Sequence, residues 1–225
     1  MKTGTELLEE LTSGRACGFV TYSGKHISAA GGSPDIIDIA VGLGRIGRWG
    51  GQSLLFWPVL LHSMVVADLL PTHLEAHGLL HDATEILIGD VPRAFKLPEV
   101  SALEEALHER IAEHLGLPPI NATEREFIRH ADNHALLAEA WVVCSGYAQK
   151  IFSDSGVFPD PVAVQLVEAY LDKYPPEHST TPYSGAVLDF SERVARALER
   201  IKQKSATPRE FSNCRTARAA RSRRS

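Results

Sequence analysis

One short stretch of the chain, residues 78–90, concentrates the residue types that could do chemistry. It reads Gly-Leu-Leu-His-Asp-Ala-Thr-Glu-Ile-Leu-Ile-Gly-Asp, so that His81 and Asp82 are adjacent in a segment otherwise apolar enough to be buried. Burying an imidazole and a carboxylate without partners is costly, and such a pair normally has a compensating ligand or ion. A buried hydrogen-bonded pair is the commoner explanation of His-Asp alone, but the surrounding residues favour a metal site.

Further metal ligands must come from other segments. His62 and Asp132 are polar residues within mostly apolar, helix-like segments on either side of the pair, although His62 could also be a hydrogen-bonded core histidine. Two imidazoles and two carboxylates suit Zn, Mn, Fe or Co better than a thiolate-selective metal. A bound divalent ion lowers the pKa of its water and polarises a phosphoryl oxygen, which is the chemistry of phosphate ester hydrolysis.

Two more carboxylates could serve such a reaction. Glu85 follows His81 by four residues and Asp82 by three, which places it on the same face of a helix. There it could orient the attacking water or shuttle its proton. Asp90, just past the expected end of that helix, could help to protonate the leaving group.

The charge of a phosphate also needs cations. Arg48, Arg93 and Lys96 are the nearest candidates in the sequence. Trp49, next to Arg48, could stack on a sugar or base or limit its size. The alternative is that Arg48 and Trp49 form a surface pair at a helix end and that Lys96 is a solvated loop residue.

Other histidines leave rival ligands open. His77 and His81 are spaced i, i+4, a geometry that can itself clamp a metal. His130 and His134 flank Asp132. We expect His77, His130 and His134 to be bystanders, because the ligand set is complete without them.

Five motifs follow one another along the chain. They are Arg48-Trp49, His62-Ser63, His81-Asp82-Ala83-Thr84-Glu85, Gly89-Asp90-Val91-Pro92 with Lys96, and Ala131-Asp132. Over residues 35–145 this order resembles that of HD-domain nucleotide phosphohydrolases, in particular bacterial 5′-deoxynucleotidases and compact phage dATP triphosphohydrolases.

The resemblance implies a role for each of these residues. Glu85 would handle the nucleophilic water, Arg48 and Lys96 would hold phosphate, and Trp49 would discriminate deoxyribose from ribose. A divalent cofactor is implied, namely Co, Mn or Zn, with Mg possible alongside the phosphates. Its ligands would be His62, His81, Asp82 and Asp132.

We therefore expect hydrolysis at the 5′ phosphate end of a deoxynucleotide. The short stretch between His62 and His81 resembles the phage-type members and favours a dATP-type triphosphohydrolase that releases nucleoside and triphosphate. A 5′-deoxynucleotidase that removes phosphate from deoxynucleoside monophosphates fits the other motifs equally well. Gly50-Gly51 after Trp49 leaves the base preference open. A catalytically silent HD module that binds a nucleotide is the alternative of another class, and Glu85 argues against it.

Helical periodicity predicts an all-α fold, a compact HD-type bundle around the metal site, with no segment of convincing strand alternation. We expect helix starts at Ser33-Pro34, at Asp160-Pro161, and at a capping box of Thr123 with Glu126. The expected helices cover about residues 34–46, 58–70, 74–88, 99–115, 123–147, 161–174 and 185–204.

Four regions follow from this pattern. Residues 1–33 are a lead-in, 34–150 the HD core, 151–204 a helical extension, and 205–225 a disordered basic tail with six Arg and one Glu. The whole chain carries a net charge of −5, so the body is acidic and a poor nucleic-acid binder, except weakly through the tail. By analogy with HD relatives we expect a homo-oligomer.

The sequence also bears on the compartment. No apolar run reaches the roughly 18–20 residues that span a bilayer, so we expect no membrane partner. The N-terminus is acidic and amphipathic rather than a signal peptide, and the three cysteines are widely spaced. These features predict a cytoplasmic protein.

Overall fold

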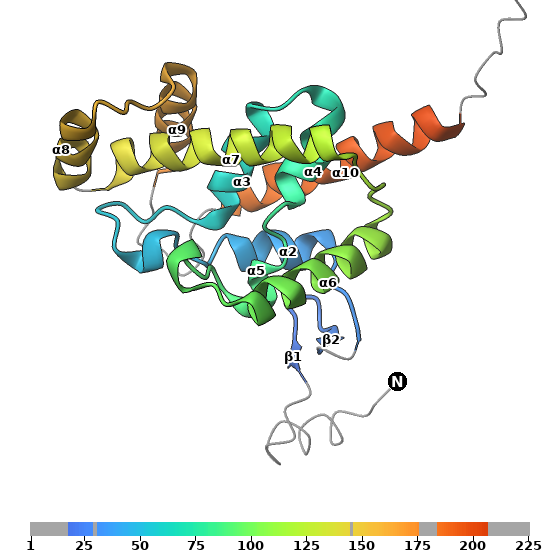
Figure 1. Ribbon diagram of the computed structural model, residues 1–225. Coiled ribbons are helices and arrows are strands. Elements are labelled where there is room, and N and C mark those ends of the chain that lie inside the picture. The colour runs from blue at the N-terminus through green and yellow to red at the C-terminus, as the bar shows by residue number, and fades with distance from the viewer. Residues whose placement is uncertain (1–17, 29–30, 145, 176–183, 207–225) are drawn as a thin grey trace, which may run out of the picture.

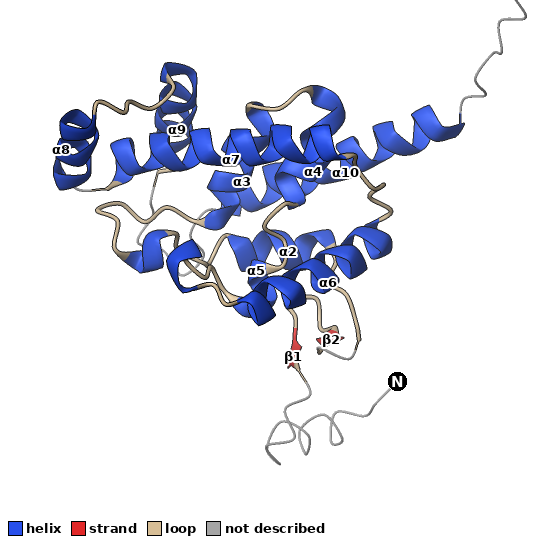
Figure 2. Ribbon diagram, viewed as in Figure 1, coloured by secondary structure: helices blue, strands red, loops and turns tan. Residues whose placement is uncertain are grey.

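The computed structural model describes residues 18–28, 31–144, 146–175 and 184–206. Most of this part of the chain is helical, with only two short strands, so the all-α prediction is confirmed at that level (Figures 1 and 2). The helices are α2 (Ile36–Leu43), α3 (Val59–Asp68), α4 (Glu75–Leu80), α5 (Glu85–Ile88), α6 (Pro98–Leu115), α7 (Ala122–Val143), α8 (Gly146–Ser155), α9 (Pro161–Lys173) and α10 (Ser184–Ala206). The predicted tail at 205–225 lies almost wholly outside the described residues.

A short hairpin precedes the helices. Strands β1 (Phe19–Val20) and β2 (His26–Ile27) pair antiparallel, within the segment that was expected to be an irregular lead-in. Asp38 of α2 ties the hairpin to the bundle, because its carboxylate accepts hydrogen bonds from the backbone N–H and the hydroxyl of Ser23 at 2.7 and 2.9 Å. The hairpin is therefore anchored to the start of the first described helix.

Helix α3 is the centre of the bundle. All of its residues from 59 to 67 are buried, because α2, α4, α7, α9 and α10 surround it. A helix that is apolar all round must be covered on every side. Among the buried residues 59–67, only His62 and Ser63 are polar. The fold therefore places an imidazole in the middle of the core.

Helices α9 and α10 complete this core. Val167 of α9 and Phe190 and Val194 of α10 belong to the same buried apolar cluster as Leu60 and Met64 of α3. Helix α10 contacts α2, α3 and α4, and α9 contacts α3 and α7 (Figure 1). Residues on both sides of the predicted boundary at 150 thus share one core.

Arg193 of α10 bridges the end of α3 and the start of α4. Its guanidinium donates to Asp68, the last residue of α3, at 2.6 Å and to Glu75, the first residue of α4, at 3.1 Å. It also donates to the hydroxyl of Tyr170 at 2.9 Å. The side chain of Arg193 is 16% exposed, and its contacts tie the end of α3 to the start of α4.

The predicted continuous helix over 74–88 is wrong. Helix α4 ends at Leu80, α5 begins at Glu85, and residues 81–84 form a turn. Bonds from residue i to i−3 mark the break: the Ala83 N–H donates to the Leu80 carbonyl at 3.1 Å, and the Glu85 N–H to the Asp82 carbonyl at 3.0 Å. This tighter winding separates two short helices without any glycine or proline between residues 79 and 88.

Two predicted helix starts are also wrong by two residues. The first described helix is capped by Asp35 rather than Ser33, and Asp38 accepts from the Asp35 N–H at 3.0 Å. Helix α7 is capped by Asn121 rather than Thr123. The reason is that an Asn-x-x-Glu sequence satisfies the same capping pattern earlier in the chain.

The predicted start at Asp160 is confirmed, because its carboxylate accepts from the backbone N–H of Val162 at 2.7 Å. Helix α7 ends at Val143, before the predicted Tyr147, which instead belongs to α8. None of the helices in the described ranges is long and apolar enough to cross a membrane.

Candidate metal centre

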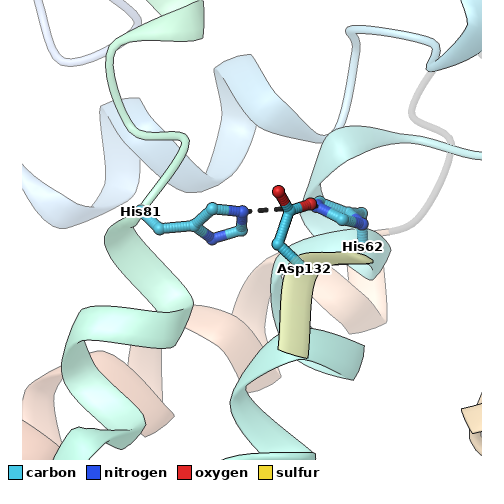
Figure 3. A group of neighbouring side chains, drawn as sticks. All are labelled: His62, His81 and Asp132. Carbon is cyan, nitrogen blue, oxygen red and sulfur yellow. Dashed lines mark hydrogen bonds and ion pairs between the residues drawn. The ribbon is translucent and has the colours of Figure 1, made fainter. Parts of the chain in front are cut away.

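Three side chains from distant parts of the sequence converge at one point. His62 comes from α3, His81 from the turn after α4, and Asp132 from α7, and one ligand atom of each lies within 4.8 Å of the others. The two Nε2 atoms are 3.2 Å apart, and Oδ1 of Asp132 is 3.3 Å from Nε2 of His62. Figure 3 shows the rings and the carboxylate facing one another. These residues form a candidate metal-binding site.

Asp82, the remaining predicted ligand, lies beside this group. Its Oδ2 is 3.1 Å from Nε2 of His81 and 3.5 Å from Nε2 of His62. Burial alone would raise its pKa, but the positive partners His81, His62 and Arg48 outweigh burial and lower it. Asp82 is therefore an anion at the same point as the two imidazoles.

The Nδ1 nitrogen of each imidazole contacts a hydrogen-bond acceptor. Nδ1 of His81 is 2.7 Å from the Gly78 carbonyl oxygen, and Nδ1 of His62 is 2.7 Å from Oε1 of Glu139. Carbonyl and carboxylate oxygens only accept, so both Nδ1 atoms must donate a hydrogen. In the neutral rings, both Nε2 lone pairs then point into the site, which is the usual arrangement for metal-binding histidines.

This arrangement fits a cation. Two lone pairs 3.2 Å apart repel each other unless positive charge lies between them or one ring takes a proton. Burial would lower the pKa of His81, but Asp82 and Asp132 raise it to about 9. The site thus attracts positive charge, and its two imidazoles and carboxylate oxygens are ligands that Zn, Mn and Co accept.

Glu139 is a functional residue that sequence reasoning missed. It is completely buried on α7, where Oε1 meets His62 and Oε2 accepts from Nε of Arg48 at 3.0 Å. It follows Asp132 by seven residues, so two helical turns place both on one face of α7. This spacing is the signal that could have pointed to it.

Arg48 lies at the site, on the loop before α3. It is buried, and its Nη1 is 3.7 Å from Oδ2 of Asp82. Burial would lower the pKa of Arg48, but the carboxylates of Glu139 and Asp82 more than compensate and raise it. The guanidinium is therefore a permanent buried cation beside the candidate ligands.

Trp49 begins the 3₁₀ turn Trp49–Gly51 in an unusual conformation. Its φ is 61°, in the left-handed region that non-glycine residues rarely adopt. Its indole Nε1 is buried and has no hydrogen-bond partner within the described part of the chain. A strained backbone and an unused donor next to Arg48 are features that cluster at ligand-binding sites.

Glu85 and Asp90 are acids with raised pKa values. Glu85 is buried, and its Oε2 has no hydrogen-bond partner among the residues described. Burial first, and then the charges of Asp82 and Asp90, raise the pKa of Glu85 to about 9. Asp90 is half-buried, and burial raises its pKa as well. Glu85 therefore holds its proton at neutral pH in the absence of a nearby metal cation, and Asp90 keeps its proton to a higher pH than an exposed aspartate does.

The two loop cations differ in their partners. Nζ of Lys96 lies 2.7 Å from Oε2 of Glu104 on α6, so Lys96 is paired with that helix. Arg93 instead reaches the site, with Nη2 at 2.5 Å from Oδ2 of Asp132 and Nη1 at 2.9 Å from Oδ1 of Asn133. The phosphate-binding role of Lys96 stays a prediction, while Arg93 is the loop cation that contacts a candidate ligand.

The rival histidines have other partners. Nε2 of His77 lies 2.9 Å from the Pro118 carbonyl oxygen. His130 pairs with Glu126 at 2.9 Å, and His134 lies 3.9 Å from Asp160. None of the three belongs to the group of convergent ligands found among the described residues.

Together, the fold and the site of the described residues define a predominantly helical protein with a candidate metal centre at its core. The chain is 36% identical over 124 residues to the uncharacterized protein YfdR of Escherichia coli K12, which covers 53% of this chain and 68% of YfdR. The chain therefore belongs to the same family as YfdR. It is also 29% identical over 174 residues to an uncharacterized protein of Rhodobacter capsulatus, covering 69% of this chain and 86% of that protein. No protein-family model matches the chain.

Proposed function

We propose that this protein is a metal-dependent phosphohydrolase of the HD type that acts at the 5′ phosphate end of deoxynucleotides. One observation carries the proposal: Nε2 of His62, Nε2 of His81 and a carboxylate oxygen of Asp132 converge beside Asp82. When bound, a divalent cation supplies Lewis acidity to a phosphoryl oxygen and a water of lowered pKa. Zn, Co or Mn suits these ligands, with Mg possible alongside the phosphates.

The proton chemistry falls to the two acids with raised pKa values. Glu85 has an unused buried oxygen with which it orients the attacking water and takes up its proton. A general base works best when its pKa is near the working pH. Burial raises the pKa of Glu85 to about 9, and the positive charge of a bound divalent cation would lower it again, so that the ionised carboxylate could take up the proton. Asp90 serves the leaving group, because its raised pKa keeps a larger protonated fraction than an exposed aspartate would have.

Phosphate binding falls to the cations around the ligands. Arg48 is a buried, always charged guanidinium beside Asp82, so it offers directed donors to a phosphoryl oxygen. Lys96 is the second cation in this proposal and must leave Glu104 to reach the substrate. Trp49, next to Arg48, contacts the deoxyribose and excludes the 2′-hydroxyl of ribose.

The substrate we favour is a deoxynucleoside triphosphate of the dATP type, which is cleaved to nucleoside and triphosphate. A 5′-deoxynucleotidase that acts on monophosphates is the alternative within the class. A catalytically silent nucleotide-binding module is the alternative outside it. The buried Glu85 supports an enzyme, because binding alone does not require an orphaned carboxyl group next to the ligands. We propose a cytoplasmic homo-oligomer.

A product assay tests the proposal. Purified protein with Co²⁺, Mn²⁺ or Zn²⁺ is offered each dNTP, each dNMP and the matching ribonucleotides. Nucleoside plus triphosphate establishes a triphosphohydrolase, whereas phosphate released from dNMPs alone establishes a 5′-deoxynucleotidase. Asp82→Asn should abolish turnover, and Asp172→Asn, an exposed carboxylate on α9, should retain it. Turnover that survives Asp82→Asn, or no metal-dependent turnover of any substrate, would contradict the proposal.

A further inference from the structure

The geometry points to Glu139 as a positioning residue that fixes the metal-binding face of His62 and the direction of Arg48 at the same time. This inference rests on the metal site of the proposed function. Glu139 is not itself one of the candidate metal ligands. Instead, its two oxygens divide between the Nδ1 of His62 at 2.7 Å and the Nε of Arg48 at 3.0 Å.

Both oxygens are needed because both neighbours are donors. The Arg48 Nε–H can only donate, and Nδ1 of His62 must donate if Nε2 is to bind a metal. Glu139 and His62 are both completely buried, so water cannot substitute for a missing acceptor. A carboxylate is the side chain that offers two acceptor oxygens and no competing donor at this position.

The two contacts have different consequences for the site. The contact with His62 selects the ring form whose Nε2 lone pair faces His81 and Asp132. The contact with Arg48 holds Nε away from the site, so that Nη1 lies toward Asp82 at 3.7 Å. The buried carboxylate of Glu139 thus orients both the Nε2 atom of His62 and the guanidinium of Arg48.

Simple neutralisation of buried charge would make a different prediction. If Glu139 only offset the charge of Arg48, any pair of substitutions that removes both charges would restore metal affinity, including Arg48→Met with Glu139→Leu. In the positioning role, Glu139→Gln leaves one oxygen for two donors, and its NH₂ group faces the donor that is left out. Metal affinity should then fall in the single variant and recover in Arg48→Met with Glu139→Gln, which keeps an acceptor for His62. It should stay low in Arg48→Met with Glu139→Leu, which offers His62 no acceptor.

The experiment is a Co²⁺ titration of metal-free protein, followed by calorimetry and by the Co²⁺ absorption spectrum. We expect Glu139→Gln to bind Co²⁺ about 10–100-fold more weakly than the unmodified protein, the usual effect of removing the partner of a metal-binding histidine. The double variant Arg48→Met with Glu139→Gln should recover most of that loss, whereas Arg48→Met with Glu139→Leu, which has no acceptor for Nδ1 of His62, should not. Glu105→Gln, an exposed glutamate on α6, is the matched control and should bind normally.

A second measurement needs no variant at position 139. Nitrogen-15 NMR of the Zn²⁺-loaded protein reports which ring nitrogen of His62 carries the hydrogen, and its signal is assigned by its disappearance in His62→Gln. We expect a protonated Nδ1 and coordination through Nε2. Coordination through Nδ1 overturns the inference, even if Glu139→Gln fails to fold.

The outcomes separate the inference from the proposed function. Equal Co²⁺ affinity of Glu139→Gln and the unmodified protein overturns the positioning role alone. Equal recovery in Arg48→Met with Glu139→Leu and in Arg48→Met with Glu139→Gln does the same, because it shows that only the charge mattered. A protein that shows the expected affinities but hydrolyses no nucleotide retains the positioning role and loses the proposed activity. An unmodified protein that binds no Co²⁺ or Zn²⁺ overturns both.

Discussion

Arg93 and Asp132 form an ion pair in which Nη2 lies 2.5 Å from Oδ2, while Oδ1 of the same carboxylate faces Nε2 of His62 at 3.3 Å. One oxygen of Asp132 therefore pairs with Arg93, and the other faces the candidate metal site. The side chain of Arg93 is 64% exposed, unlike the buried Arg48. Arg93 is thus a cation that an incoming phosphate can meet at the edge of the site.

Arg93→Gln should weaken substrate binding more than it weakens the fold. A charge-assisted hydrogen bond is worth about 1.5–3 kcal/mol, so KM for the hydrolysed nucleotide should rise about tenfold or more. The free energy of unfolding should fall by less than about 1 kcal/mol, because the pair is solvent-exposed. Steady-state kinetics and urea unfolding measure the two effects. Arg129→Gln, an exposed arginine of α7 paired with Glu126, is the control, and equal KM in both variants would remove Arg93 from the phosphate site.

Metal removal should lower the melting temperature of the protein. An ion that binds the folded state at about 100 times its Kd adds about 2.7 kcal/mol to the free energy of unfolding. For a chain of this size, that is a rise in Tm of about 5–10 °C, which a chelator should reverse. Differential scanning calorimetry measures the change.

His81→Ala should abolish this rise, because it removes a ligand from the turn after α4. His130→Ala should keep it, because His130 is exposed and paired with Glu126 outside the group. A metal-dependent rise of equal size in His81→Ala would place the ion elsewhere.

Acid should release the hairpin through Asp38. Burial alone would raise its pKa, but hydrogen bonds from the N–H groups of Ser23 and Asp35 and from the Ser23 hydroxyl outweigh burial and lower it. Because the folded-state pKa lies below the unfolded value, the stabilisation is complete above the unfolded pKa of 3.8. It is lost as pH falls below that value through the folded pKa.

Asp38→Asn should therefore cost about 1–3 kcal/mol at neutral pH, and the difference from the unmodified protein should shrink between about pH 4 and 2. Urea unfolding at a series of pH values measures both quantities. A constant difference in the free energy of unfolding across this range would show that ionisation of Asp38 does not stabilise the fold.

Phe190→Ala should destabilise the whole molecule, because Phe190 is a fully buried residue of α10 within the central cluster. Removing a buried phenyl ring costs about 3–5 kcal/mol. Leu188→Ala on the same helix is the control, since Leu188 is 61% exposed, and should change stability by less than about 0.5 kcal/mol. Loss of α10 in a separate, earlier unfolding transition would show that it folds independently of the core.

The sequence was most informative where a polar residue interrupts an apolar segment. His62 and Asp132 were predicted as ligands on that basis, and they lie with His81 in one group. Glu139 escaped notice because glutamate is common on helix surfaces and its burial depends on Arg48, 91 residues away in sequence. Single-sequence patterns carry no information about such a long-range partner.

Local signals also misplaced the backbone around His81. Residues 79–88 contain no glycine or proline, so periodicity extended one helix across them. The chain instead forms α4 and α5, joined by a turn with hydrogen bonds from residue i to i−3. Lys96 illustrates the same limit, because the charge of Glu104 on α6 decides where its ammonium group lies.

Helix α7 carries Asp132 and Glu139 two turns apart, and it packs against α9. The backbone hydrogen bonds of the helix keep the spacing of the two residues, so any tilt of α7 displaces both carboxylates together. Substitutions of buried α9 residues such as Val167 should therefore impair metal retention and nucleotide affinity together. In a saturation mutagenesis, the buried positions of α9 would then fall on one line when the two phenotypes are plotted against each other.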